Sequence, residues 1–259
     1  NPALATIEQQ VMLPLFGESP IEHGINEDNF EQMLMSIQAD ETYLRLYAEA
    51  FPEQDEPLLG ELAWDNSVKA IASFVRGMTS FDSAFDRGEM SDAAKRGEAL
   101  FNSERLECFH CHDGYNFSDA TIDRGVTFLE PLFHNTGLYN IDGMGAYPDP
   151  NTGRHEVTGN PDHMGQFRTP SLRNVAVTAP YNHDGSVPTL EGVIRNYAAG
   201  GRVIASGEHA GDGRMNPLKD GVLVSFQITD AEVDDLVAFL ESLTDDAFLT
   251  DPRFSDPWR

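Results

Sequence analysis

Residues 1–90 alternate apolar and polar positions with the period of an α-helix. Apolar residues recur at three- and four-residue spacing in four segments: 7–15, 29–38, 41–51 and 64–78. This spacing places an apolar stripe along one side of each helix, so we expect four amphipathic helices. A fifth short helix is predicted from Ser91, its N-cap, up to the cysteines that follow.

From Gly114 to Pro180 the helical period disappears, and Gly, Pro, Asn and Asp interrupt the chain instead. This composition predicts long ordered loops, and loops of such length usually wrap something. Two more helices are expected afterwards, one over 189–201 and one over 229–243, where Thr229 and Glu232 form a capping box. The sequence has no internal repeat of solenoid period. It therefore predicts a mainly α-helical protein.

The charge balance does not alter the predicted fold, but it excludes one class of function. The chain has 17 basic and 43 acidic residues, a net charge of −26, which repels nucleic acid and anionic lipid. Nucleic-acid binding is therefore excluded, while a basic partner and adaptation to a salty habitat both fit. No apolar run approaches the roughly 20 residues that a membrane-spanning helix needs. At 40% hydrophobic residues, the chain can bury a core.

The chain has two cysteines, Cys108 and Cys111, and His112 follows them directly. Such a pair occurs in redox sites, zinc sites, disulfides and haem anchors. A thioredoxin-like pair needs a preceding strand, and a zinc site needs two more ligands at comparable spacing. In Cys-x-x-Cys-His both thiols bond the haem vinyl groups and the histidine ligates the iron. We therefore expect covalent haem c, no disulfide, and a periplasmic location.

The second axial ligand of the iron separates electron carriers from catalysts. Methionine raises the potential, whereas an open or weakly held position permits peroxide chemistry. Six downstream residues are candidates for this ligand: His134, Met144, Met164, His183, Tyr197 and Met215. Spacing alone does not choose among them.

The run FRTPSLRNVAVTAPYNHDGSVPTLEGVIRNYAAGG, residues 167–201, resembles the second haem domain of the bacterial di-haem peroxidases, the family of cytochrome c peroxidase and MauG. Three further segments, at 91–119, 133–137 and 228–244, resemble family segments in the same order. The resemblance implies a cytochrome c-like haem domain with long ordered loops at 90–259. Residues 1–89 are then the helical remainder of a first, peroxidatic haem domain.

The resemblance also implies roles for individual residues. Tyr197 stands at the position of the sixth ligand, where cytochrome c peroxidases have Met and MauG relatives have Tyr. Carbonyl oxygens of Thr178 and Pro180 correspond to calcium ligands, and carbonyl oxygens suit that cation. Arg168 and Arg173 are expected to pair with haem propionates. The ending FLTDPRFSDPW is similar to the MbnH-like branch, which oxidises a tryptophan of a partner protein.

Family members carry two Cys-x-x-Cys-His motifs, and this chain has one. Residues 1–24 resemble the segment that directly follows the WDGR-like stretch of the family's first haem domain, so we expect a fragment whose complete form holds a second haem. Gln10 and Glu22 align with the glutamine and glutamate above the peroxidatic haem, although their spacing is two residues longer than in the peroxidases. Glu22 is expected to act as the general acid and base toward peroxide, an effect worth about a hundredfold or more.

These expectations describe a periplasmic di-haem oxidoreductase of the cytochrome c peroxidase and MauG family. It would use hydrogen peroxide to form high-valent iron and would oxidise a protein partner, with this chain carrying the second haem. The partner would be a small cytochrome, a copper protein or an MbnP-like protein. The alternative is a mono-haem electron-transfer subunit without peroxidase activity.

Overall fold

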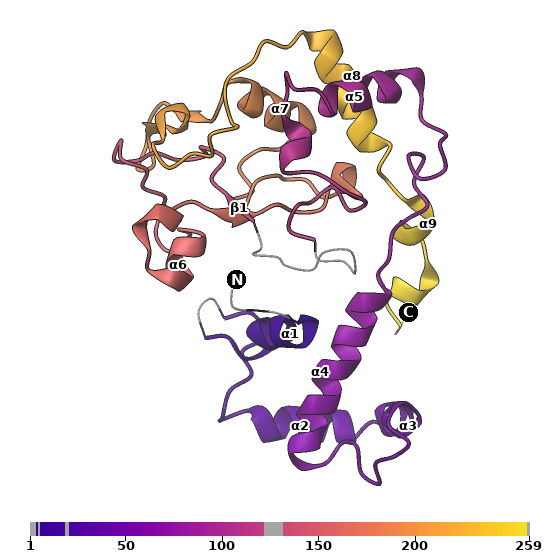
Figure 1. Cartoon of the computed structure of the whole chain (residues 1–259). Helices are drawn as coiled ribbons and strands as arrows, with labels where there is room; N and C mark the ends of the chain where they lie inside the picture. The colour runs from indigo at the N-terminus through magenta and orange to yellow at the C-terminus, as the bar shows by residue number, and fades with distance from the viewer. Residues whose placement is uncertain (1–3, 5, 19–20, 122–131, 258–259) are drawn as a thin grey trace. The chain divides into compact units, whose positions relative to one another are not determined.

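A computed structural model describes residues 4, 6–18, 21–121 and 132–257. The chain forms two compact units, the N-terminal unit Ala3–Thr79 and the C-terminal unit Ser80–Arg259 (Figure 1). Each is described by itself. Across the described ranges, no helix is both long and apolar enough to cross a membrane.

The N-terminal unit contains the four predicted helices: α1 Ile7–Phe16, α2 Phe30–Gln38, α3 Glu41–Ala50 and α4 Gly60–Gly77. A capping box of Thr6 and Gln9 begins α1. Helix α1 packs against α4, where Val11, Val68 and Ala72 form a small buried cluster. The amphipathic pattern is therefore confirmed.

The C-terminal unit contains longer helices at its two ends and short elements between them. The α-helices are α5 Asp92–Phe101, α6 Arg154–Thr158, α7 Leu190–Ala198, α8 Asp230–Glu241 and α9 Asp246–Leu249. The strands form two antiparallel pairs: β1 Phe133–His134 with β2 Phe167–Arg168, and β3 Val203–Ile204 with β4 Gly211–Asp212. The 3₁₀ turns are Cys108–His110, Pro161–His163, Val175–Val177, Gly213–Met215 and Pro252–Phe254. Apart from these, the described part of 114–180 consists of loops, as the sequence predicts.

Helices α5 and α8 pack closely and form the core of the C-terminal unit (Figure 1). A Cβ atom on Gly97 would lie 1.9 Å from the carbonyl oxygen of Asp235, so only glycine permits this approach. Phe239 and Leu243 have no exposed surface beneath it. Ser91 caps α5, and Thr229 caps α8 with Glu232 in the expected capping box. This pair fixes the helix that leads to the cysteines.

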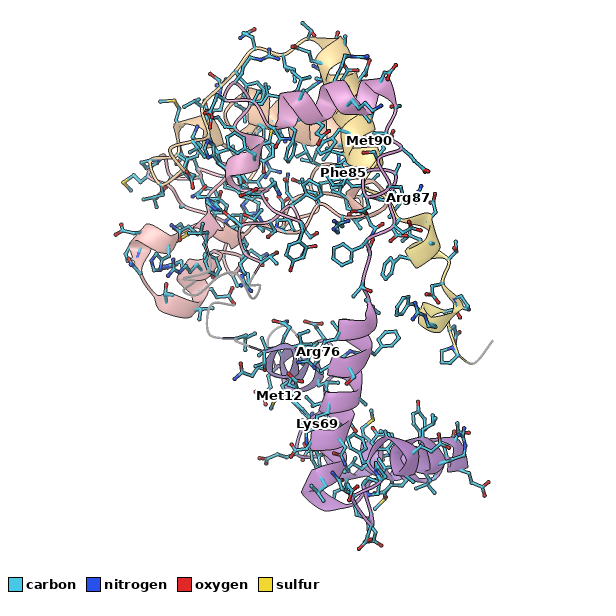
Figure 2. The ribbon with its side chains drawn as sticks, turned by 45° about the vertical axis from the view of Figure 1, so that its right-hand side comes forward. Met12, Lys69, Arg76, Phe85, Arg87 and Met90 are labelled. Carbon is cyan, nitrogen blue, oxygen red and sulfur yellow. The ribbon has the colours of Figure 1, made fainter. Side chains whose placement is uncertain are left out.

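The two compact units divide at 79/80; the boundary between haem domains at 89/90 stays a prediction. The buried carboxylate of Asp245 accepts bonds from the Ser80 hydroxyl at 3.1 Å and the Asp82 N–H at 3.0 Å. Phe85 packs against the core of α5 and α8. Figure 2 labels Phe85, Arg87 and Met90 on this segment. Side chains therefore join residues 80–89 to the C-terminal unit, although they contain no helix.

Candidate haem-binding site

A 3₁₀ turn, Cys108–His110, carries the two cysteine thiols, both of them free. Glu107 enters the turn in the left-handed region, at φ 60°. The N–H of His112 donates to the carbonyl of Cys108 at 3.0 Å, which brings the histidine back over the turn. Burial raises the pKa of the Cys108 thiol to about 12. Residues 108–112 thus present the neutral thiol of Cys108, the thiol of Cys111 and an imidazole together.

The ring of His112 is oriented for metal binding. Its Nδ1 lies 3.1 Å from the carbonyl oxygen of Phe117, and this bond requires the proton on Nδ1. Nε2 then keeps its lone pair. Burial lowers the pKa of His112, so the ring is neutral at pH 7. Histidines that ligate metals commonly donate their other N–H to a carbonyl in this way.

Tyr197, on α7, lies near the same turn. Burial, and then the charges of Cys111 and Cys108, raise the pKa of its hydroxyl well above the ordinary value. No hydrogen bond to this hydroxyl occurs among the described residues. Tyr197, His112 and Cys108 nevertheless all keep some accessible surface. Together, the two cysteines, His112 and Tyr197 are the donors that haem c needs.

The three candidate methionines differ from Tyr197 in exposure or in packing. Met144 and Met215 are 73% and 72% exposed. Met164 packs instead against the cluster that contains Leu138. The methionines are therefore surface or packing residues.

The two candidate histidines are also engaged elsewhere. Both ring nitrogens of His134 bond carboxylates, those of Asp119 and Asp220. His183 stacks on Phe167 with ring centroids 3.8 Å apart. Tyr197 and His134 both lie near the cysteines, and of these two only Tyr197 has a side chain without a hydrogen-bond partner among the described residues.

The two arginines expected at propionates differ in their partners. The Arg173 side chain is 7% exposed, and its guanidinium bonds Asp86 at 2.9 Å and the carbonyl of Tyr115 at 2.6 Å. Its partner in the structure is thus a carboxylate of the chain itself. Arg168 is exposed, and its nearest acceptor, the carbonyl of Ala120, is 3.5 Å away. Arg168 remains the better candidate for a propionate.

The expected calcium ligands lie on an exposed segment after the 3₁₀ turn Val175–Val177. Thr178 uses its hydroxyl and its N–H to bond the carbonyl of Val175. Among the described residues, no hydrogen bond uses the carbonyl oxygens of Thr178 and Pro180. These oxygens are therefore free to ligate a cation.

The expected peroxidatic residues both lie in the N-terminal unit. Gln10 is exposed on α1, and Glu22 is exposed on the loop that follows that helix. The N–H of His23 donates to the carbonyl of Pro14, so this loop returns along α1. A pocket of about 330 Å³ beside it is lined by Gly17, Glu18, Ile21, Gly24, Ile25 and Asn26. The structure thus places Gln10 and Glu22 on connected elements of one unit.

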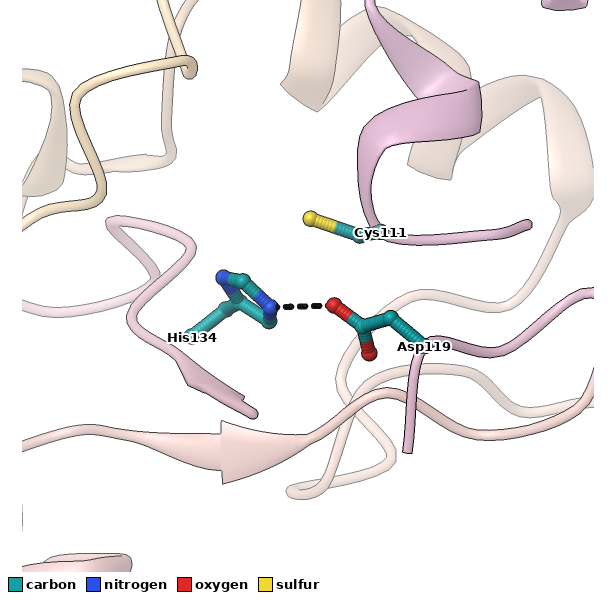
Figure 3. Close-up of side chains that lie close together, drawn as sticks. All are labelled: Cys111, Asp119 and His134. Atoms are coloured by element: carbon teal, nitrogen blue, oxygen red, sulfur yellow. Dashed lines mark hydrogen bonds and ion pairs between the residues drawn. The ribbon is translucent and has the colours of Figure 1, made fainter. Parts of the chain in front are cut away.

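Sequence reasoning missed one cluster beside the cysteine turn. Asp119 and Asp220 bracket His134, and Cys111 lies next to the Asp119–His134 pair (Figure 3). Asp119 is 15 residues from His134 and Asp220 is 86 residues away, so no local pattern signals the cluster. The sequence pointed only to His134 itself, which lies within the resembling FHNTG segment and is one of the six candidate ligands.

Comparison with known proteins identifies the family. The sequence model described as "Di-haem cytochrome c peroxidase" matches residues 2–95. The crystal structure of a MauG-like protein associated with microbial copper homeostasis superposes with a TM-score of 0.95 at 50% identity. That match covers 100% of this chain and 74% of the other.

Two curated relatives agree. The methylamine utilization protein MauG of Methylophilus methylotrophus is 30% identical over 92% of this chain and 61% of its own length. Cytochrome-c peroxidase IdrP1 of Denitromonas iodatirespirans is 33% identical over 72% of this chain. The chain spans 61% and 50% of the lengths of these two relatives. The haem-anchoring turn and these similarities together show that the chain belongs to the family of the di-haem cytochrome c peroxidases and MauG.

Proposed function

We propose that the complete protein is a periplasmic oxidoreductase that uses hydrogen peroxide to oxidise a protein partner, and that this chain carries the second of its two haems c. The observation that carries the proposal is the pairing of His112 with Tyr197 at the cysteine turn. His112 offers Nε2, and Tyr197 offers a buried hydroxyl that has no partner among the described residues. Bound haem supplies iron that accepts and stores oxidising equivalents.

The side chains around the turn would each have a defined task. Cys108 and Cys111 would hold the haem through thioether bonds, and the Phe117 carbonyl would keep His112 oriented toward the iron. Tyr197 would release its phenolic proton on ligation, since an anionic oxygen favours iron in its oxidised states. Arg168 would pair with a propionate. Carbonyl oxygens of Thr178 and Pro180 would hold calcium.

The N-terminal unit would complete the peroxidatic site of the other haem. Ile71 and Val75 of α4, and Met78 directly after it, are 39%, 40% and 42% exposed, and they form an apolar edge beside the contact of α4 with α1. Exposed apolar stripes of this kind mark contact surfaces. We propose that a further haem-bearing segment covers this edge. Glu22 would then take a proton from bound peroxide and return it to the leaving oxygen, with Gln10 beside it.

The partner would be a protein electron donor, with a small cytochrome, a copper protein and an MbnP-like protein as the candidates. The MauG-like relative is associated with microbial copper homeostasis, which supports a partner from copper handling. The net charge of −26 favours a basic docking face on that partner. Tyr197 in place of methionine supports partner oxidation over simple electron entry.

The test is peroxide treatment of the haem-loaded protein at its natural length, followed by absorption and electron paramagnetic resonance spectroscopy. One equivalent of peroxide should oxidise the protein by two electrons, and Tyr197→Met should shorten the lifetime of that state at least tenfold. Tyr181→Phe is the matched control, because the Tyr181 hydroxyl bonds the carbonyl of Val175. A single haem and no reaction with peroxide would instead establish the mono-haem electron-transfer subunit.

A further inference from the structure

His134, on β1, lies between two carboxylates. Its Nε2 is 2.7 Å from Asp119 Oδ2, and its Nδ1 is 2.5 Å from Asp220 Oδ2 (Figure 3 shows the Asp119 side). Ionised carboxylates only accept hydrogen bonds, so both ring nitrogens must donate. A ring that donates from both nitrogens is an imidazolium. The structure therefore shows two negative charges and one positive charge in a row.

This row is largely shielded from water. The side chains of His134, Asp119 and Asp220 are 16%, 8% and 26% exposed. Asp119 Oδ1 is buried and has no partner among the described residues, so His134 supplies the main compensation for that carboxylate. Charges are expensive to bury unless they are paired. The imidazolium thus supplies the positive charge that pairs with Asp119.

The cluster is attached directly to the haem-anchoring turn. Cys111 Sγ lies within 4.8 Å of the bonding atoms of Asp119 and His134. The N–H of Asp119 donates to the carbonyl of Cys111 at 2.8 Å. The N–H of Asp220 donates to the carbonyl of Asn135 at 2.9 Å. His134 therefore ties two loops to the turn that bears the cysteines.

The other charged and titratable groups around the row do not take the place of His134 between the two carboxylates. Arg168 lies across the β1–β2 pair but is exposed, and Lys219 donates to the carbonyls of Gly200 and Arg214. His112 is neutral. Bonds from the Cys111 sulfur and from both carboxylates raise the pKa of His134 to about 10 against the effect of burial. The two carboxylate bonds remain when Cys111 is joined to haem.

We propose that His134 is a positioning residue of the haem site, a permanent imidazolium that joins the Asp119 and Asp220 loops to the cysteine turn and sets the reduction potential of the haem on Cys108 and Cys111. A positive charge close to the haem opposes loss of an electron from the iron, and a negative charge favours it. The inference rests on haem attachment at these cysteines, which belongs to the proposed function.

The test compares two variants whose charge changes have opposite sign. His134→Gln leaves two carboxylates without the imidazolium, so the midpoint potential of this haem should fall. Asp220→Asn keeps an acceptor for His134 Nδ1 and removes one negative charge, so the potential should rise. Potentials are measured by spectroelectrochemical titration of the haem-loaded protein at pH 7. His155→Asn is the control, since the partly exposed ring of His155 bonds the carbonyl of Asn160, and it should leave the potential unchanged.

The outcomes separate an electrostatic role from a purely structural one. Shifts of opposite sign support the proposal. Unchanged potentials, or shifts of the same sign in both variants, overturn it. If His134→Gln does not retain haem, then Asp119→Asn joins Asp220→Asn, and both must lie above the wild-type potential. A wild-type protein without covalent haem would refute the proposed function instead.

Discussion

The two long helices α4 and α8 differ in how completely their apolar side chains are buried. Helix α8 lies against α5 so closely that Gly97 is needed, and it buries Val233, Leu236 and Phe239 almost completely. Helix α4 buries Ala63 in the cluster around Trp64 and buries Val68 and Ala72 against α1, but it leaves Ile71 and Val75 exposed. The apolar positions of α8 are therefore covered almost completely, whereas those of α4 are covered only in part.

This difference reflects the size of the hydrophobic core that each unit forms within the described chain. The C-terminal unit forms a continuous core around α5 and α8 and builds the cysteine turn on it. The N-terminal unit forms two smaller clusters, one around Trp64 and one around Val68. Burial of apolar surface is the main stabilising contribution, so the C-terminal unit should be the more stable of the two.

The largest effect is expected where the helix pair of the C-terminal unit is closest. Gly97→Ala places a Cβ atom 1.9 Å from a backbone carbonyl oxygen, which forces α5 and α8 apart. We expect a loss of more than about 3 kcal/mol in the free energy of unfolding, enough to prevent folding of this unit. Urea denaturation followed by circular dichroism measures it. Gly77→Ala at the end of α4 is the control, because its Cβ meets nothing within 4 Å, and it should be neutral or slightly stabilising.

A smaller effect on the free energy of unfolding is expected when the buried face of α8 is compared with the exposed edge of α4. Leu236→Ala opens a cavity in the core of α5 and α8, where the side chain is 3% exposed, and should cost about 2 to 5 kcal/mol. Val75→Ala, on the exposed edge of α4, should cost less than about 0.5 kcal/mol in this chain. The same denaturation measurement compares them. Equal losses would mean that the α4 edge is already packed, contrary to the contrast drawn here.

Sequence reasoning succeeded where the information is local. The helical period found the long helices, and Ser91 and Thr229 marked their starts. The Cys-x-x-Cys-His motif pointed to haem, the family resemblance singled out Tyr197, and the structure places Tyr197 near the cysteine turn. Each of these signals spans a few residues or an aligned motif.

Sequence reasoning failed where distant residues meet. The contact of Ser80 with the carboxylate of Asp245 was not predicted, because the two residues are 165 positions apart. The two-residue strands were missed because they are too short for a period of two to appear. The Asp119–His134–Asp220 row was missed for the same reason as the Ser80–Asp245 contact. Polar contacts between residues far apart in the sequence can be identified only from the three-dimensional structure.

The Asp245 contacts also predict a pH dependence of the C-terminal unit. Burial opposes ionisation of this carboxyl, but bonds from the N–H groups of Phe248 and Asp82 and from the Ser80 hydroxyl outweigh it and lower its pKa. A folded pKa below the unfolded value of about 3.9 stabilises the unit above about pH 4, and this contribution is lost as the pH falls through the folded pKa. Asp245→Asn should cost about 1 to 3 kcal/mol at pH 7 and much less near pH 3.

Exposed Asp234 on α8 provides the control for that measurement. Asp234→Asn should leave the free energy of unfolding at pH 7, and its pH dependence, close to those of the wild type. Urea titrations at pH 7 and pH 3 distinguish the two positions. A constant loss in Asp245→Asn at both pH values would show that its bonds do not depend on the ionised carboxylate.

The smallest effect on stability is expected for two ion pairs, one from each unit, that differ in burial. Arg173 and Asp86 in the C-terminal unit are 7% and 15% exposed, and Arg76 and Glu8 in the N-terminal unit are 48% and 34% exposed (Figure 2 labels Arg76). The bond from Arg76 lowers the pKa of Glu8 to about 2, but water and salt screen an exposed pair.

Asp86→Asn should therefore destabilise its unit by about 1.5 to 3 kcal/mol, with little dependence on salt, because it removes charged hydrogen bonds from a buried guanidinium. Glu8→Gln should have no measurable effect at 0.5 M sodium chloride. Denaturation at low and high salt decides between them. If Glu8→Gln destabilised the chain at high salt as strongly as Asp86→Asn, the α1–α4 surface would have to be shielded from solvent. The proposed place of a further haem-bearing segment on that surface would then already be filled.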